Sequence, residues 1–186
     1  MGQLARRGVI GGLVAGAMLG QAMPASATPK VGKPAPKFTV WTFEGKKITL
    51  ADLAGDVVIL NYWATWCGPC RAELPLISGW VKNYQQRYQR DDLKVFAITT
   101  ENSAPDNVLK PLAKVLSFPL ITKLDTWSYG TIDNAVPTNY VIDRSGILRY
   151  ARAAAFSAEA LNELLPPLLS EARQDAPVSG PAATVS

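Results

Sequence analysis

The two cysteines, Cys67 and Cys70, are the residues whose type and spacing point most directly to chemistry. They are the only cysteines among 186 residues, and two residues separate them. The apolar, β-branched and aromatic run over residues 57–63 predicts a buried strand just before them. Apolar residues at helical spacing over residues 77–88 predict a helix just after them. The pair is therefore expected where a strand ends and a helix begins.

That position favours redox chemistry. The first N–H groups of a helix lack intrahelical partners and lie at the positive end of its dipole, so they stabilise an anion. Only a thiolate attacks a disulfide. We therefore predict that Cys67 has a lowered pKa and is exposed enough to act as a nucleophile, and that Cys70, a turn further in, is a more buried resolving thiol. Gly68 and Pro69 suit the tight entry, because proline at a first helical position needs no N–H.

Other uses of a cysteine pair fit the composition less well. A structural disulfide would close too short a loop to restrict the unfolded chain much. A zinc site needs about four ligands, and the chain has no other cysteine and no histidine. A Cu(I) site would need thioether or imidazole ligands, but Met23 is the last methionine. Covalent haem attachment would need a histidine where Arg71 stands. We expect no metal and no cofactor.

The run Val58-Ile-Leu-Asn-Tyr-Trp-Ala-Thr-Trp-Cys-Gly-Pro-Cys70, followed by Arg71-Ala-Glu-Leu-Pro75, resembles thioredoxin-fold proteins of the TlpA/ResA/DsbE kind. These are extracytoplasmic thiol–disulfide oxidoreductases of bacteria. The resemblance extends over residues 31–169. It implies an α/β thioredoxin fold, with a central mixed sheet flanked by helices, an N-terminal β-hairpin and a central strand–helix insert.

Local patterns agree with that fold. Strands are predicted at residues 38–42, 47–50, 93–100, 118–121, 138–142 and 147–151, the first two joined through Glu44-Gly45, with a helix between residue 106 and about residue 115. Ser157 is expected to cap a last helix. Pro166-Pro167 should kink that helix or divide it in two.

Within the resemblance, Asn61 stands where thioredoxin has a buried aspartate that handles the proton of the second cysteine. An amide does not titrate, so another residue must take that role. Glu73 is the candidate, because it lies three residues beyond Cys70 on one helical face and matches the acidic residue of the ResA-like motif. A partly desolvated carboxylate there would have a raised pKa and could exchange the proton. The alternative is a surface glutamate favoured by the helix dipole.

The segment around Pro137 is the second predicted part of the site. On pattern alone, proline is an allowed first residue of a strand. The resemblance implies a cis bond between Val136 and Pro137, packed against the cysteines, with the Val136 backbone turned toward an extended segment of a partner. Trp66 is either a core aromatic or an exposed contact for partner proteins. Trp66, Val136 and Pro137 are therefore candidate substrate-binding residues.

Residues 1–27 predict a signal peptide, with a basic start, an uncharged apolar stretch and the small-residue cleavage site Ala25-Ser26-Ala27. An uncleaved membrane anchor is the alternative. Residues 28–172 are expected to form the thioredoxin-like domain and residues 173–186 a disordered tail. Without its basic start, the net charge falls from +4 to +2, which is too small to argue for nucleic acid.

The resemblance implies a periplasmic protein-disulfide reductase. The Gly-Pro pair between the cysteines is that of thioredoxin, a reductant with a potential of about −270 mV. Expected partners are oxidised client proteins, such as apocytochrome c or a copper-site assembly protein, and a membrane thiol electron carrier of the DsbD/CcdA kind that acts as reductant. We expect a monomer. A dithiol oxidase and a non-enzymatic thioredoxin-fold metallochaperone remain alternatives, and the adjacent second cysteine disfavours a thiol peroxidase.

Overall fold

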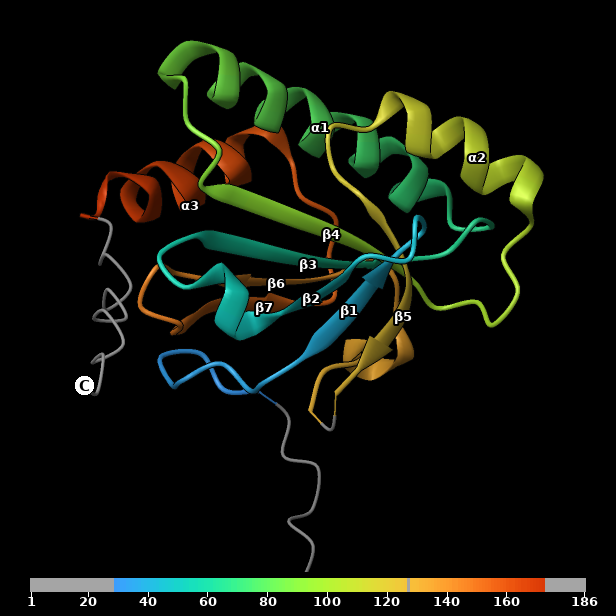
Figure 1. Ribbon diagram of the computed structural model, residues 1–186, viewed down its shortest axis with the longest axis horizontal. Helices are drawn as coiled ribbons and strands as arrows, with labels where there is room; N and C mark the ends of the chain where they lie inside the picture. Colours follow the sequence, from blue (N-terminus) through green and yellow to red (C-terminus); the bar gives the residue numbers. More distant parts are fainter. Residues whose placement is uncertain (1–28, 127, 173–186) are drawn as a thin grey trace, which may run out of the picture.

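The computed structural model of the protein describes residues 29–126 and 128–172. The predicted signal peptide, residues 1–27, and the predicted disordered tail, residues 173–186, lie outside the described residues. Between them, one mixed seven-stranded sheet runs through the described chain (Figure 1). Its strand order is β2-β1-β5-β4-β3-β6-β7.

The strands are β1 (Thr39–Thr42), β2 (Lys47–Thr49), β3 (Val57–Trp63), β4 (Leu93–Thr99), β5 (Leu120–Asp125), β6 (Thr138–Ile142) and β7 (Leu148–Arg152). The helices are α1 (Gly68–Tyr88), α2 (Asp106–Val115) and α3 (Ala158–Ser170), with short 3-10 turns at Leu50–Leu53 and Ile132–Asn134. β4 lies parallel to β3 and to β5, and the other pairs are antiparallel. The predicted mixed sheet and N-terminal hairpin are both present.

β3 is buried along its whole length because both faces of the sheet are covered. Successive side chains of a strand point to opposite faces. Ile59 and Trp63 pack with residues from all three helices. Leu60 packs on the other face with Phe38, near the start of the described chain, and Leu53 of the first 3-10 turn. The same alternation places Asn61 on the helical face.

The predicted strand–helix–strand insert consists of β4, α2 and β5. β5 is longer than the residue pattern predicted, and it begins at Leu120 rather than at residue 118. The reason is tertiary, because β5 pairs with β4 on one side and with β1 on the other. Through β5, the N-terminal hairpin is joined to the rest of the sheet.

Of the two outcomes predicted for Pro166-Pro167, a kink or a division of the last helix, the division is wrong, because α3 is one helix from Ala158 to Ser170. Its N-cap is Ser157, whose hydroxyl accepts a hydrogen bond from Ala160 N at 3.1 Å, as expected. Burial of the leucines at 161, 165, 168 and 169 holds the helix against the sheet. Proline has a φ compatible with a helix, although it removes backbone hydrogen bonds. The packing of the leucines outweighs that loss.

Candidate active site

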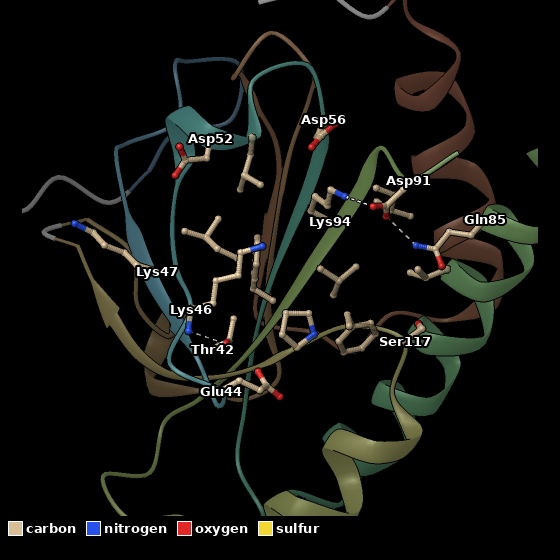
Figure 2. Close-up of a pocket in the computed structure, with 18 residues that line it drawn as sticks. Thr42, Glu44, Lys46, Lys47, Asp52, Asp56, Gln85, Asp91, Lys94 and Ser117 are labelled. Atoms are coloured by element: carbon tan, nitrogen blue, oxygen red, sulfur yellow. Dashed lines mark hydrogen bonds and ion pairs between the residues drawn. The ribbon is translucent and has the colours of Figure 1, made fainter. Parts of the chain in front are cut away.

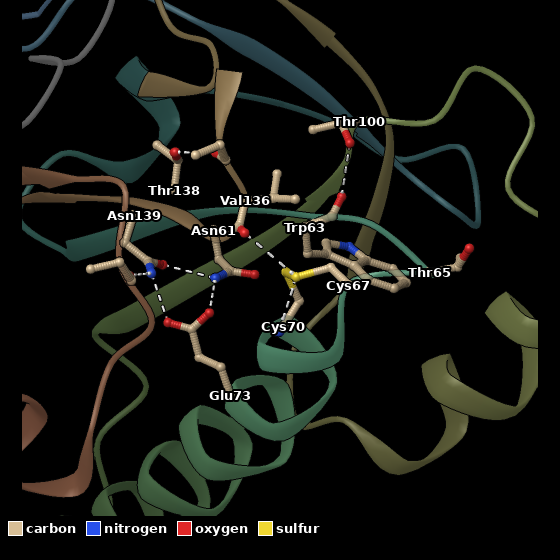
Figure 3. The surroundings of a disulfide bond; sticks show 12 residues. Asn61, Trp63, Thr65, Cys67, Cys70, Glu73, Thr100, Val136, Thr138 and Asn139 are labelled. Carbon is tan, nitrogen blue, oxygen red and sulfur yellow. Dashed lines mark hydrogen bonds between the residues drawn. A yellow bond between two sulfur atoms is a disulfide. The ribbon is translucent and has the colours of Figure 1, made fainter. Parts of the chain in front are cut away.

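Cys67 and Cys70 form a disulfide at the start of α1 (Figure 3). Cys67 is the N-cap residue, with an extended backbone, and Pro69 lies in the first turn. The sulfur of Cys67 accepts a hydrogen bond from the backbone N–H of Cys70 at 3.2 Å. The predicted position between a strand and a helix is therefore correct. The Cys67 sulfur is bound by an N–H of the first helical turn, which has no partner within the helix.

Both cysteines are buried, and Cys67 is more enclosed than the sequence suggested. Cys70 has no exposed surface, as expected for the inner residue, but Cys67 is only 4% exposed. Its sulfur lies 3.6 Å from the carbonyl oxygen of Val136, so the segment before β6 covers it from the side opposite α1. That cover comes from a segment 69 residues away in the chain, and no local pattern around Cys67 reports it.

The peptide bond between Val136 and Pro137 is cis, as the resemblance implied. Pro137 is buried and Val136 half-buried. The hydroxyl of Thr138 holds this segment, because it donates to Ala135 O at 2.7 Å and accepts from Ile132 N at 3.1 Å. The backbone of Val136 is thereby kept beside the disulfide.

Trp66 lies on the surface with 72% of its area exposed, so its role is not that of a core aromatic. The residue before it is held by a side chain that the sequence reading missed. Glu101, which follows β4, accepts hydrogen bonds from Thr65 N at 2.5 Å and Thr65 Oγ1 at 2.8 Å. Because β3 and β4 are parallel, the chain leaving each strand emerges at the same edge of the sheet. Only that topology could have indicated Glu101.

Glu73 is buried, 1% exposed, which excludes the surface-glutamate alternative. Its Oε2 accepts from Asn61 Nδ2 at 2.9 Å, and its Oε1 accepts from Asn139 Nδ2 at 2.7 Å and from Phe156 N at 2.6 Å. Burial raises the pKa of Glu73 above its ordinary value, and the three donors offset part of that effect. A raised pKa was predicted, but the amide partners were not.

Asn139 is the second residue that the sequence reading missed. It is the register partner of Asn61 across β3 and β6, and its Oδ1 accepts from Asn61 Nδ2 at 2.8 Å. Both amides are fully buried. A buried asparagine in each of two buried strands was the available signal, but nothing local indicated that the two strands were neighbours.

Two further observations bear on ligands. Among the described residues, no group of three or more His, Cys, Asp or Glu side chains is arranged to hold a metal ion. A pocket of about 840 Å³ lies beside the N-terminal hairpin and contains none of the predicted site residues (Figure 2). Its lining includes both lysines and carboxylates, so it carries no single sign of charge.

A smaller pocket of about 400 Å³ lies between α1 and α2, beside residues that flank the disulfide in the chain. Thr65 and Arg71, which flank the cysteines in the chain, line one side of it. Val108 and Val115 of α2 line the other side and are exposed. The surface around the disulfide is therefore partly apolar on the α2 side.

The fold and the site together define a thioredoxin-fold protein with a disulfide between two nearby cysteines at the start of a helix. The chain belongs to the AhpC/TSA family, whose sequence model matches residues 31–151.

Its relatives agree with that class. The chain is 35% identical over 120 residues to the thiol-disulfide oxidoreductase ResA of Bacillus cereus, covering 63% of this chain and 66% of the relative. It is 30% identical to the thioredoxin-like protein YneN of Bacillus subtilis, covering 72% and 78%. Among solved structures, a thiol:disulfide interchange protein of the thioredoxin family from Chlorobium tepidum is 27% identical, with a TM-score of 0.58 and coverage of 78% and 99%. The ResA-like resemblance read from the sequence is confirmed.

Proposed function

We propose that the protein is a thiol–disulfide oxidoreductase that reduces disulfides in other proteins, with Cys67 as nucleophile and Cys70 as resolving thiol. The observation that carries this proposal is the placement of the Cys67 sulfur at the N-terminus of α1, where the N–H of Cys70 donates to it at 3.2 Å. When the disulfide is reduced, the same N–H and the helix dipole stabilise a thiolate at Cys67.

The reaction has two exchange steps. In the first, the thiolate of Cys67 attacks one sulfur of the client disulfide, forms a mixed disulfide and releases a client thiolate. In the second, Cys70 loses its proton and attacks the Cys67 sulfur, which releases the second client sulfur. Two electrons pass to the client, whose two sulfurs end as thiols, and the protein ends with the Cys67–Cys70 disulfide.

The surface around the disulfide supports binding of an extended client segment. The exposed ring of Trp66 offers a flat apolar contact. We assign the backbone of Val136, held by Pro137, to pair with the client chain in the manner of an added strand. Gly68 and Pro69 shape the tight entry into α1, which keeps the Cys67 sulfur at the helix end.

We assign control of the Cys70 proton to Glu73. The second exchange step requires that proton to leave, and Glu73 is the buried carboxylate one helical turn beyond Cys70. Burial raises the pKa of Glu73 above its ordinary value, so the carboxyl group holds a proton more readily than an exposed glutamate does.

The setting that we propose is the periplasm. Residues 1–27 act as a signal peptide, residues 28–172 as the functional domain and residues 173–186 as a disordered tail. No helix within residues 29–126 and 128–172 is long and apolar enough to cross a membrane. Similarity to ResA and the signal-like N-terminus support export. The domain acts as a monomer on oxidised clients, apocytochrome c or copper-site assembly proteins among them, and a membrane thiol carrier of the DsbD/CcdA kind reduces it again.

Trapping tests the proposal. Cys70→Ala removes the resolving thiol, so client proteins should remain attached to Cys67 as mixed disulfides that a reductant releases. The Cys67→Ala/Cys70→Ala double variant is the control and should trap nothing. Absence of adducts, together with failure of the wild-type dithiol to exchange with any small disulfide, would refute the function.

A redox titration sets the direction of the reaction. A potential near that of thioredoxin, about −270 mV, is expected for a reductase. A potential near that of the strong oxidant DsbA, about −120 mV, would instead assign the protein to the dithiol oxidases.

A further inference from the structure

Asn61 has a polar atom that the oxidised structure leaves unused. Its side chain is fully buried in β3. Nδ2 donates to Glu73 Oε2 at 2.9 Å and to Asn139 Oδ1 at 2.8 Å, but Oδ1 has no hydrogen-bond partner. Buried polar atoms are normally paired, so an unpaired acceptor beside a reactive disulfide calls for an explanation.

The orientation of the amide follows from its neighbours. Oxygen and nitrogen of an asparagine are distinguished by their hydrogen bonds. A flipped Asn61 would place its oxygen against the carboxylate of Glu73 and the carbonyl oxygen of Asn139, which are both acceptors. The nitrogen must therefore face these two residues, and the oxygen must face away from them. Figure 3 shows that oxygen directed toward the sulfurs of Cys67 and Cys70.

Glu73 itself is turned away from the sulfurs. Both of its oxygens are occupied by donors from Asn61, Asn139 and Phe156. Asn61 therefore lies between the carboxylate and the disulfide (Figure 3). Its nitrogen donates to Glu73, and its oxygen points toward the sulfurs.

A disulfide has no hydrogen to donate, which explains the unpaired oxygen in the oxidised protein. Reduction gives Cys70 an S–H group, a weak donor, in the same buried place. We propose that Asn61 binds the thiol of reduced Cys70, accepting a hydrogen bond from its S–H at Oδ1 while donating to Glu73 from Nδ2. This inference deepens the proposed function and rests on it, since it concerns the resolving thiol of the same site.

The consequence is that the two thiols favour different protonation states. A hydrogen bond to the neutral thiol favours the protonated form of Cys70. The helix N–H at Cys67 favours its thiolate instead. Charge on Glu73 polarises the amide of Asn61 and strengthens its oxygen as an acceptor, so the state of the carboxylate reaches Cys70 through Asn61. Cys70 thus stays protonated until a mixed disulfide has formed on Cys67.

Few other titratable groups face this thiol in the described chain. Cys67 is the N-cap of α1 and Glu73 lies within that helix. Tyr150 of β7 lies near Glu73, and burial, which is the main cause, raises the pKa of its hydroxyl. Arg152 lies over the Tyr150 ring, 5.8 Å from its centroid. In the variants below Cys67 is replaced by serine throughout, and Glu73, Tyr150 and Arg152 remain in place, so a difference between variants reports the change at the amide.

The test is a titration of Cys70 alone. Cys67→Ser leaves one thiol, and its thiolate is followed by ultraviolet absorbance against pH, with the Cys67→Ser/Cys70→Ser protein as blank. Asn61→Ala in this background should raise the thiolate fraction below the titration midpoint about fivefold, the factor that corresponds to one hydrogen bond of average net strength. Asn61→Asp keeps an oxygen in place and should leave the thiolate fraction equal to or lower than that of the parent.

Asn139→Ala is the matched control. It removes an equally buried amide and one donor to Glu73 but leaves the Asn61 oxygen in place, so its effect should stay below about twofold. An unchanged or lower thiolate fraction in Asn61→Ala would overturn the proposal. So would equal increases in Asn61→Ala and Asn139→Ala, since these would report general loosening. If Asn61→Ala does not fold, Asn61→Val replaces it with the same expectation.

This titration uses no client and no exchange reaction. Failure of wild-type protein to exchange disulfides would therefore count against the proposed function, whereas an unresponsive Cys70 midpoint would count against the role of Asn61.

Discussion

Removal of the Glu73 carboxylate is the sharpest test of what holds the site together. The side chain is 1% exposed. It accepts hydrogen bonds from Asn61 Nδ2 at 2.9 Å, Asn139 Nδ2 at 2.7 Å and Phe156 N at 2.6 Å. Glu73→Ala leaves these three donors without their acceptor in a buried space. The free energy of unfolding of the oxidised protein should therefore fall.

The magnitude follows from two opposing terms. Each buried donor left unpaired costs about 1–3 kcal/mol. Against that, alanine relieves the cost of burying a charged group, which is the main cause of the raised pKa of Glu73. We expect a net loss of about 3 kcal/mol, at the low end of what breaking a buried charged contact costs. For a chain of this size, that corresponds to a fall in Tm of about 6–12 °C.

Glu73→Gln separates charge from shape. Glutamine keeps the volume and one carbonyl oxygen but turns an NH₂ group toward a donor, so we expect a loss of about 1 kcal/mol at neutral pH. The sign of the pH dependence follows from the raised pKa of Glu73. A group whose pKa is raised by folding stabilises the protein fully below its unfolded pKa and loses that contribution as pH rises through the folded pKa. The free energy of unfolding of the wild type should therefore exceed that of Glu73→Gln by the largest amount at acid pH.

The assay is thermal unfolding with the disulfide intact, at neutral pH and below pH 4.5, the ordinary pKa of the group. Glu163→Ala, an exposed position on α3, is the control and should change stability by less than about 0.5 kcal/mol. A Glu73→Ala variant as stable as wild type would show that the burial cost of the carboxylate cancels its three hydrogen bonds. If the difference in stability between wild type and Glu73→Gln widened as pH rises, the raised pKa of Glu73 would be refuted.

Three further outcomes are expected. Asp92→Ala should cost about 3–5 kcal/mol, because it strands the buried guanidinium of Arg144, which donates to Asp92 at 2.8 Å. Burial alone would raise the pKa of Asp92, but hydrogen bonds hold it below its ordinary value. In denaturant titrations, the difference in free energy of unfolding between wild type and Asp92→Ala should therefore persist above pH 3.8 and shrink as pH falls through the folded pKa. Trp66→Ala should leave the free energy of unfolding unchanged, within about 0.5 kcal/mol, while raising KM for a protein disulfide more than for a small disulfide. Glu101→Ala frees two Thr65 donors and should lower stability by about 1–2 kcal/mol, measured by urea unfolding; an unchanged midpoint would contradict the role given to that contact.

Prediction from the sequence worked where the signal was local. The apolar run of β3 placed that strand at Val57–Trp63, and the cysteine pair after it marked the start of α1. Prediction was weaker where neighbours decide the outcome. β5 extends to Asp125 because β1 pairs with it from Ile121 onward. α3 passes through Pro166-Pro167 because its leucines are buried.

The same division holds within the site. A raised pKa at Glu73 was predictable from its place one turn beyond Cys70. Its actual partners were not, because Asn139 lies 66 residues away and Phe156 lies 83 residues away. The exposure predicted for Cys67 was too high for the same reason, since Val136, which covers its sulfur, is 69 residues away in the chain and precedes β6, the strand next to β3 in the sheet.

What the amino-acid sequence alone determined is the chemistry: two cysteines two residues apart, between an apolar strand and a helix, with a carboxylate one turn further on. Those features depend on neighbours within a few positions, and strand and helix periodicity reports such neighbours directly. What only the tertiary structure decided is the environment of the sulfurs: the carbonyl of Val136, the amides of Asn61 and Asn139, and the clamp of Glu101 on Thr65. These groups meet because the order of strands in the sheet brings together segments far apart in the chain, and no local pattern encodes that order.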